Sequence, residues 1–272
     1  MGTTNTVILT IHNKEKTVGA ILNGILTSSS TFTTNLVIVL DGCTDDTRRV
    51  VENAIKTRPD NRIVIRLIET DDVWETRANN AGMRLADTDY VTLIQDDMLI
   101  KHPSWDRALL EVFNSRKVFA VSGRASHDFS LRNGQFAPEN LSGREFPLGL
   151  TSLRGRAVGR FMRVFRPFWI YRFWGPVAVA LTVNRGPLML RRDLVVHLGY
   201  LDEDFAPFEL DDVDLCCRAF KSWGLKSASR PIYYEEVGGS KATSSISSEM
   251  SERCIRKNTA LLKSRHADLA IP

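Results

Sequence analysis

The chain has 272 residues, of which 43% are hydrophobic and 25% are charged, and its formal net charge is +4. This composition suits one large globular domain, or a domain with a sizeable insertion, that has a substantial core. It excludes a membrane-spanning helix, because no stretch reaches the ~20 uninterrupted apolar residues that a span needs. The opening residues MGTTNTVILTIHNKEK also lack the basic and long apolar regions of a secretory signal, so we expect a cytoplasmic protein.

The cysteines support the same compartment. The cysteines are Cys43, Cys216, Cys217 and Cys254. No two of them form a CxxC pair, and no histidine lies at zinc-ligand spacing from them. This pattern predicts free thiols in a reducing environment, and it argues against a disulfide framework or a zinc site.

Strand-like and helix-like segments alternate along the first part of the chain. Short apolar runs predict strands at 7–11, 36–40, 63–68, 90–94 and 118–122, and helical spacing predicts helices at 15–26, after an N-cap at Thr44, at 76–86 and at 103–113. Such alternation is typical of a parallel sheet covered on both faces. We therefore predict a doubly wound α/β unit over 1–125, with ligands at the carboxyl ends of its strands.

Polar residues follow three of these strands where each strand ends. They are Thr10, His12 and Asn13, then Asp41, and finally Gln95, Asp96 and Asp97. One such group would be ordinary turn or capping chemistry, but three at one sheet edge indicate a nucleotide site. The sequences GxGxxG and GxxxxGK[ST] are absent, which excludes an ordinary NAD-binding fold and a P-loop NTPase.

The middle of the chain is rich in arginine. Residues 146–192 contain nine arginines and no acidic residue, and within them 154–174 combines arginines with aromatic side chains. Such a segment can lie on an anionic membrane surface, bind a phosphorylated acceptor, or pack on the domain as a covering helix, and these alternatives stay open. No nucleic-acid-binding motif accompanies the arginines, so we predict no nucleic-acid partner.

A run of acids precedes a helix in the last third of the chain. Residues 201–220 contain seven carboxylates, namely Asp202, Glu203, Asp204, Glu209, Asp211, Asp212 and Asp214. A helix N-terminus favours the ionised carboxylate, which is a base rather than an acid. Helix capping, with an Asp214–Arg218 pair at i,i+4 spacing, is the alternative role. A strand at 231–234 and a helix at 252–265 are predicted to follow.

Four segments in this order resemble family 2 of the glycosyltransferases, which are inverting enzymes with a GT-A fold. They are VILTIHNKEKTVGAIL, VIVLDGCTDDT, ETRANNAGMRLADTDYVTLIQDDM and GPLMLRRDLVVHLGYLDEDFAPFELDDVDLCCRA. The resemblance implies a single GT-A catalytic domain over 1–272. In it, 1–125 binds the nucleotide-sugar, 126–192 is a variable region, and 193–272 carries the acceptor side, the catalytic base and a C-terminal helix.

The resemblance also implies which residues bind the nucleotide. The matching positions are Thr10, His12, Asn13, Asp41, Arg77 and Asp96. Among them Asp41 would contact the base, Asp96 would lie near the ribose, and Arg77 would reach the diphosphate. The family usually has two acids after the second strand, and here only Asp41 is present.

A metal and a catalytic base are implied in the same way. Asp97 would bind Mn²⁺ or Mg²⁺, since one or two carboxylates and the substrate phosphates suffice to hold such a cation. Glu236 is a second candidate ligand, at a place where many relatives have histidine. The pair Asp211-Asp212 would supply the base, and Asp212 matches its position. Because the commoner pair is Glu-Asp, the choice between Asp211 and Asp212 stays open.

The implied activity is metal-dependent, inverting transfer of a sugar, expected from a UDP-sugar, to a hydroxyl of a glycan, a lipid-linked or another acceptor. A peripheral membrane contact through 154–174 would suit a lipid-linked acceptor. A sugar nucleotidyltransferase is an alternative, although TIHNKEKT is not its usual glycine-rich loop. A non-catalytic nucleotide-sugar-binding scaffold is another, although it would have no need of a base.

Overall fold

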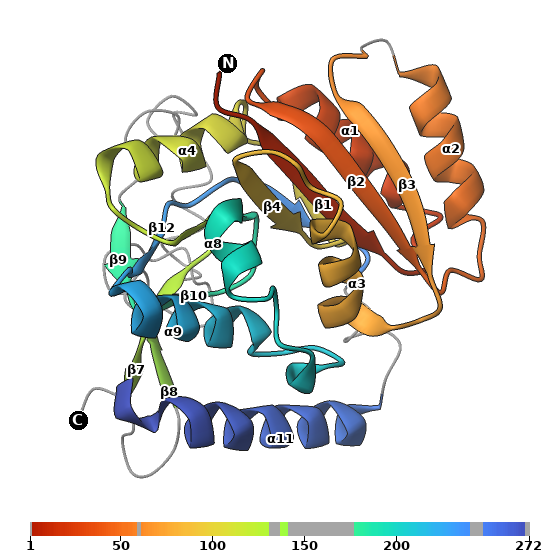
Figure 1. Cartoon of the computed structure of the whole chain (residues 1–272). Coiled ribbons are helices and arrows are strands. Elements are labelled where there is room, and N and C mark those ends of the chain that lie inside the picture. The colour runs from red at the N-terminus through yellow and green to blue at the C-terminus, as the bar shows by residue number, and fades with distance from the viewer. Residues whose placement is uncertain (1, 59–60, 131–136, 141–176, 240–246, 270–272) are drawn as a thin grey trace, which may run out of the picture.

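The computed structural model describes residues 2–58, 61–130, 137–140, 177–239 and 247–269. In these residues an eight-stranded sheet runs through the protein in the order β3-β2-β1-β4-β11-β6-β12-β9 (Figure 1). Its strands are β1 (Asn5–Ile11), β2 (Thr33–Asp41), β3 (Val64–Thr70), β4 (Tyr90–Ile94), β6 (Ala120–Ser122), β9 (Ala178–Ala180), β11 (Leu188–Arg191) and β12 (Ser227–Ser229).

The first four strands of this sheet are parallel, and β11 is antiparallel to both of its neighbours, β4 and β6. The polar residues that follow β1, β2 and β4 therefore meet at one edge. A mostly parallel sheet confirms the predicted doubly wound α/β architecture.

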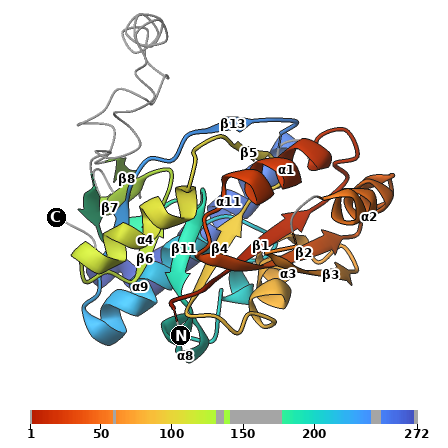
Figure 2. The ribbon, with the colours of Figure 1, turned by 90° about the horizontal axis from the view of Figure 1, so that it is seen from above.

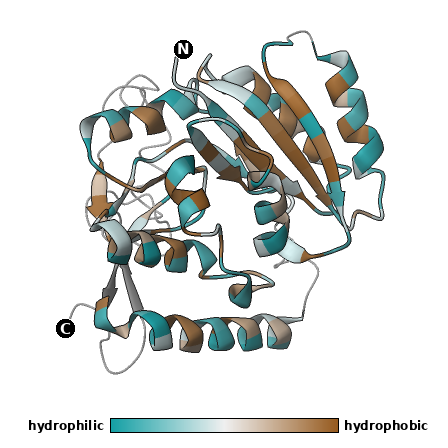
Figure 3. Ribbon diagram, in the orientation of Figure 1, coloured by the Kyte–Doolittle hydropathy of each residue, from teal (hydrophilic) through white to brown (hydrophobic). Residues whose placement is uncertain are grey.

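Helices cover both faces of the sheet (Figure 2). On one face lie α1 (Val18–Ser28), α2 (Thr47–Thr57) and α4 (Trp105–Ser115), and on the other lie α3 (Trp74–Met83), α8 (Arg192–His197) and α9 (Asp211–Trp223). Successive residues of β1 point to opposite faces, so Val7 and Leu9 pack with the first group and Ile8 packs with the second. The strands are largely brown in the hydropathy colouring of Figure 3, as expected for a sheet buried on both sides.

Short elements complete the fold. The strand β13 (Tyr234–Glu236) pairs with β5 (Met98–Ile100), and a second small sheet contains β7, β8 and β10. In this small sheet β7 is Ser126–Ser130, β8 is Ala137–Asn140 and β10 is Thr182–Val183. Two short 3-10 helices are η2 (Glu203–Phe205) and η3 (Ala267–Leu269).

The long helix α11 (Ser248–His266) runs alongside α9 at the edge of the molecule (Figure 1). Its Leu262 packs with Phe205 and Val213 in a third apolar cluster. A buried carboxylate joins the two helices as well, because Asp214 of α9 accepts from Arg218 at 2.6 Å and lies 2.9 Å from the ring of His266. The predicted Asp214–Arg218 pair is thus confirmed.

The predicted elements are confirmed with shifted ends. Thr44 is not the N-cap of α2, because Asn13 binds the backbone N–H of Thr44 and the helix begins only at Thr47. The strand predicted at 231–234 begins at Tyr234. The four cysteines are free thiols, as predicted.

No helix in the described parts of the chain has both the length and the hydropathy that a membrane crossing requires. The segment 154–174, for which we considered membrane or acceptor contact, lies outside the described residues.

Candidate active site

A small cavity lies where β1, β2 and β4 end. Its lining residues are Thr10, His12, Asp41, Trp74, Glu75, Asn79, Ile94, Gln95, Asp96 and Phe208. The structure therefore brings together four of the predicted nucleotide-binding residues. It also adds a wall that the sequence did not reveal, in which the rings of Trp74 and Phe208 stack with centroids 5.9 Å apart.

Asp41, the last residue of β2, is buried and binds the loop between β3 and α3. Its Oδ1 accepts hydrogen bonds from the backbone N–H of Val73 at 2.7 Å and from the Thr70 hydroxyl at 2.9 Å, and its Oδ2 accepts from the N–H of Trp74 at 3.0 Å. Trp74 has φ of 70°, a left-handed backbone that a bulky residue adopts only when its surroundings enforce it. Asp41 thus holds the backbone of Trp74, whose side chain lines the cavity.

The β1 end is also tied to its neighbours. The ring Nδ1 of His12 donates to the carbonyl oxygen of Asp41 at 2.6 Å, and the backbone N–H of His12 donates to Asp96 at 3.0 Å. Thr10 donates to the side-chain oxygen of Asn79 at 3.0 Å. Asn13 lies outside the cavity lining, where its side-chain oxygen accepts from the backbone of the loop before α2.

Asp96 and Asp97 follow β4 and differ in their partners. Asp96 is buried, which raises its pKa to about 7, although the Lys14 ammonium at 3.8 Å opposes that shift. Burial also raises the pKa of Asp97, and the negative charge of Glu236 adds to that effect. The pairing of β13 with β5, in which Glu236 lies opposite Met98, brings these two carboxylates to the same place.

The donor set around Asp97 fits a hard divalent cation. Its Oδ1 is buried and has no hydrogen-bond partner among the described residues, which is a costly state for a carboxylate oxygen unless a cation or ligand engages it. No three acidic, histidine or cysteine side chains in the described residues form a complete metal site. Asp97, with Glu236 nearby, could therefore hold Mn²⁺ or Mg²⁺ when phosphate oxygens supply the remaining ligands.

The acidic pair at the start of α9 lies in a buried polar network. Asp211 forms an ion pair with Arg185, and its other oxygen accepts from the Thr76 hydroxyl at 2.8 Å. Asp212 accepts from the backbone N–H of Arg185 at 2.7 Å and from that of Val213 at 2.8 Å. Asp211 is thus held by a side-chain cation, whereas Asp212 is held by backbone N–H groups.

The two neighbouring carboxylates therefore titrate in opposite directions. Burial raises the pKa of Asp211, but the charge and hydrogen bond of Arg185 outweigh that effect, and the pKa ends below its ordinary value. Burial, aided by the negative charge of Asp211 and opposed by the charge of Arg185, raises the pKa of Asp212 to about 7. Asp211 stays ionised near neutral pH, whereas Asp212 can take up and release a proton there.

Arg185 connects this acidic pair to the cavity. Its guanidinium also forms an ion pair with Glu75 at 2.8 Å, and Glu75 accepts from Gln95, the residue before Asp96, at 3.1 Å. Sequence reasoning missed Glu75, Thr76 and Arg185. For Arg185 there was a signal, because it lies in the acid-free, arginine-rich stretch, and Glu75 and Thr76 begin the segment ETRANNAGMRLADTDYVTLIQDDM that carries part of the family resemblance.

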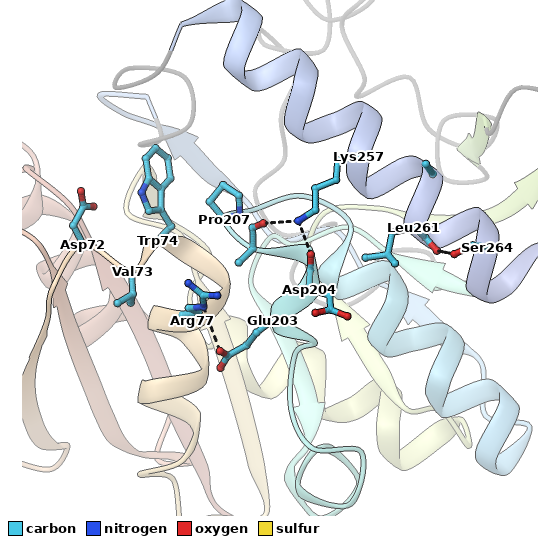
Figure 4. A pocket seen from close by; sticks show the side chains of 12 residues that line it. Asp72, Val73, Trp74, Arg77, Glu203, Asp204, Pro207, Lys257, Leu261 and Ser264 are labelled. Carbon is cyan, nitrogen blue, oxygen red and sulfur yellow. Dashed lines mark hydrogen bonds and ion pairs between the residues drawn. The ribbon is translucent and has the colours of Figure 1, made fainter.

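Arg77 lies apart from the cavity. It lines a separate surface hollow between α3, η2 and α11, shown in Figure 4, and there it pairs with Glu203 at 3.3 Å. Trp74 borders both the hollow and the cavity. The structure therefore brings Asp41, Asp96 and Asp97 to one edge of the sheet, but it does not place Arg77 among the residues that line the cavity.

Comparison with known proteins places the chain in a family. The family model described as "Glycosyl transferase family 2" matches residues 6–172. No curated protein sequence matches the chain significantly.

Solved structures share its fold at low identity. A mannosyltransferase from Pyrobaculum calidifontis, in complex with GDP-Man and Mn²⁺, is 18% identical with a TM-score of 0.57. It covers 84% of this chain, which in turn spans only 54% of that protein. Glucosyl-3-phosphoglycerate synthase from Mycobacterium tuberculosis, with Mg²⁺ and UDP, is 17% identical with a TM-score of 0.57, and the match covers 100% of this chain and 81% of that one. TarS from S. aureus, with UDP-GlcNAc, is 16% identical with a TM-score of 0.57, and the match covers 95% of this chain and 66% of that one.

The family model matches more than half of the residues of this chain. The chain therefore belongs to glycosyl transferase family 2, and it has the GT-A fold.

Proposed function

We propose that the protein transfers a sugar from a nucleotide diphosphate sugar to a hydroxyl acceptor, with inversion at the anomeric carbon. Family membership supports glycosyl transfer in general. The observation that carries the more specific proposal is the contrast between Asp211, which is neutralised by Arg185, and Asp212, whose pKa lies at about 7. A carboxylate with such a pKa is suited to remove a proton at neutral pH.

The donor would bind with its nucleoside in the cavity at the carboxyl ends of β1, β2 and β4. Thr10, His12 and Asp96 line the cavity, and Asp41 holds the Trp74 wall. Asp97, with Glu236, would hold Mn²⁺ or Mg²⁺. Such a cation, when bound, offsets the charge of the departing diphosphate.

Asp212 would act as the general base. It takes the proton of the acceptor hydroxyl, while the hydroxyl oxygen forms a bond to the anomeric carbon. The bond between that carbon and the diphosphate oxygen breaks on the opposite side, and the nucleotide diphosphate leaves with the electron pair. Attack from the side opposite the leaving group inverts the configuration. Asp211 and Arg185 would keep Asp212 in place rather than exchange protons.

A UDP-sugar is our proposed donor, since two of the similar structures contain UDP or UDP-GlcNAc, while a third contains GDP-Man. The acceptor would be a hydroxyl of a glycan, a lipid-linked or another compound, bound beside Asp212 by the second half of the chain. Residues 1–125 would thus bind the donor and 193–272 would supply the base.

A thermal-shift panel tests this proposal without knowledge of the acceptor. UDP, GDP, UDP-glucose, UDP-GlcNAc and GDP-mannose are each added with and without Mn²⁺. A ligand that binds only the folded state raises its stability by mass action. We expect a Mn²⁺-dependent rise in Tm with the uridine compounds. A rise with guanosine compounds alone would overturn the UDP assignment, and no rise with any compound would overturn the proposed function.

A further inference from the structure

The turn at residues 205–210 has an unusual backbone and carries two parts of the site. Phe208 projects from it to stack on Trp74 at the cavity wall, and Asp211 follows it directly at the start of α9. Two consecutive residues of the turn, Glu209 and Leu210, have φ of 74° and 68°. Neither is glycine, so this left-handed pair persists only where surrounding contacts hold it.

One side chain of α11 supplies such contacts. The amide nitrogen of Asn258 donates to the carbonyl oxygens of Phe205 at 2.7 Å, Phe208 at 2.7 Å and Glu209 at 3.0 Å. Asn258 is completely buried, and an amide has two N–H groups, so these three carbonyls use its full donor capacity. The thiol of Cys254, one helical turn earlier, lies 3.4 Å from the carbonyl oxygen of Phe208.

Other side chains of α11 also reach the turn, because Leu262 packs with Phe205 and Lys257 donates to the carbonyl oxygen of Ala206 at 3.2 Å. The helix is attached through Leu262 in the third apolar cluster and through His266 on Asp214. Asn258 instead binds only backbone carbonyls of the turn and the nearby thiol of Cys254. It lies beyond the residues 6–172 that the family model matches.

We propose that Asn258 is a positioning residue for the transfer reaction, which holds the 205–210 turn so that Phe208 closes the donor cavity and Asp212 faces the acceptor. This inference rests on the proposed function. Through the turn, one amide on α11 sets the position of a donor wall and of the general base together. Loss of the amide should therefore change both donor affinity and turnover, whereas a change in α11 away from the turn should change stability alone.

The test compares Asn258→Leu, which keeps the volume and removes the donors, with Ser247→Ala, a control that removes the side-chain cap at the N-terminus of α11. Hydrolysis of UDP-glucose, UDP-GlcNAc and GDP-mannose is measured with Mn²⁺ at a temperature well below the Tm of each variant. We expect Asn258→Leu to lower kcat by about tenfold or more and to raise the donor KM several-fold. Ser247→Ala should lower the Tm while both constants stay within about twofold of the unchanged protein.

Unchanged kcat and KM in folded Asn258→Leu, or equal kinetic losses in Ser247→Ala, would overturn the inference and leave the proposed function standing. If Asn258→Leu does not fold, Asn258→Gln replaces it, because this variant keeps the amide but displaces it by one methylene. A loss of turnover in folded Asn258→Gln supports positioning, and full activity overturns it. Absence of turnover in the unchanged protein with all three donors would overturn the proposed function, and this inference with it.

Discussion

Asp211 and Asp212 are neighbours in the sequence, yet their surroundings give them different chemistry. Asp211 lies against the guanidinium of Arg185 and the hydroxyl of Thr76, both of which stabilise its charge. Asp212 has only backbone N–H donors, and burial keeps its pKa at about 7. The sequence leaves open which of the two acids is the base. Arg185, which lies 26 residues before Asp211, favours Asp212 because it keeps Asp211 ionised.

Asp212→Asn should lower kcat by about 10²–10⁴-fold, the range that general bases contribute, while UDP binding stays within about twofold. Asparagine has nearly the same shape but cannot accept the proton. Kinetics with the donor selected by the ligand panel and calorimetry with UDP measure the two effects. Asp211→Asn is the comparison, because it should chiefly lower the Tm by removing one of the two carboxylates that pair with Arg185. A fully active Asp212→Asn protein would refute the assignment of the base.

The pH dependence of kcat/KM should follow Asp212. Because burial raises the folded-state pKa to about 7, the carboxyl carries its proton below that pH and cannot accept another. Activity should therefore rise as the pH increases through about 7 and then level off. The residual activity of Asp212→Asn should lack this rise. A profile that falls across the same interval in the unchanged protein would contradict a base with a raised pKa.

Asp97→Asn should remove the Mn²⁺-dependent part of nucleotide binding. The buried Oδ1 of Asp97 would no longer carry charge for the cation, while the cavity that receives the nucleoside is left intact. Titration of UDP with and without Mn²⁺ measures the difference. Glu15→Gln, at an exposed carboxylate of the loop after β1, is a control that should retain the metal effect. Equal Mn²⁺ dependence in Asp97→Asn and the unchanged protein would exclude the ligand role.

At the scale of elements, the loop between β3 and α3 shapes the cavity that we propose for the donor. Asp41 at the end of β2 binds two of its backbone N–H groups, and the loop then presents Trp74 to Phe208. The end of β2, the start of α3 and the turn before α9 thus meet at the Trp74–Phe208 pair, although they are far apart in the sequence. The cavity wall depends on contacts between elements rather than on any one of them.

Trp74→Ala should raise the donor KM about tenfold, which corresponds to about 1.4 kcal/mol, and should leave kcat nearly unchanged. The ring forms the cavity wall but does not take part in proton transfer. Steady-state kinetics with the preferred donor separates the two constants. Trp223→Ala, at the far end of α9, removes a half-exposed tryptophan outside the cavity and should change neither. A selective loss of kcat in Trp74→Ala would instead place this ring at the reacting atoms.

Most elements of the first half could be predicted because their apolar residues recur at the spacing of strands and helices. The antiparallel strand β11 could not, since Leu188–Arg191 is only four residues long and its direction depends on its pairing with β4 and β6. Thr44 was expected to cap α2 from its residue type, but a long-range contact with Asn13 decides its place. Local patterns predicted the elements, and contacts between distant residues decided the exceptions.

Across the whole molecule, charged side chains of the candidate site join the two halves of the chain. Glu75 on α3 and Asp211 on α9 both pair with Arg185, and Glu236 on β13 lies near Asp97. The sequence predicted Asp97, Asp211 and Glu236 as candidate site residues, because each follows a strand or starts a helix, but it did not predict Glu75. It could not predict the cations that compensate them, since Arg185 and Lys14 reach the site only through the folded chain.

Arg185→Met should lower the free energy of unfolding by about 3–5 kcal/mol, because it leaves the carboxylate of Asp211 buried without a cation. Denaturant unfolding measures this loss. The double variant Arg185→Met/Asp211→Asn should be more stable than the sum of the two single losses predicts, since the neutral side chain no longer needs the cation. Additive losses would show that Arg185 and Asp211 do not stabilise each other.

The dependence of the 205–210 turn on Asn258 also has a consequence for synthesis on the ribosome. The nucleotide-binding strands leave the ribosome long before residue 258, so a nascent chain can acquire its sheet while the turn that carries Phe208 still lacks its hydrogen bonds. Chains stalled before α11 should thus contain a folded sheet but transfer no sugar. Catalytic competence would then arise late in translation, when the acidic pair and the donor wall are fixed in one step.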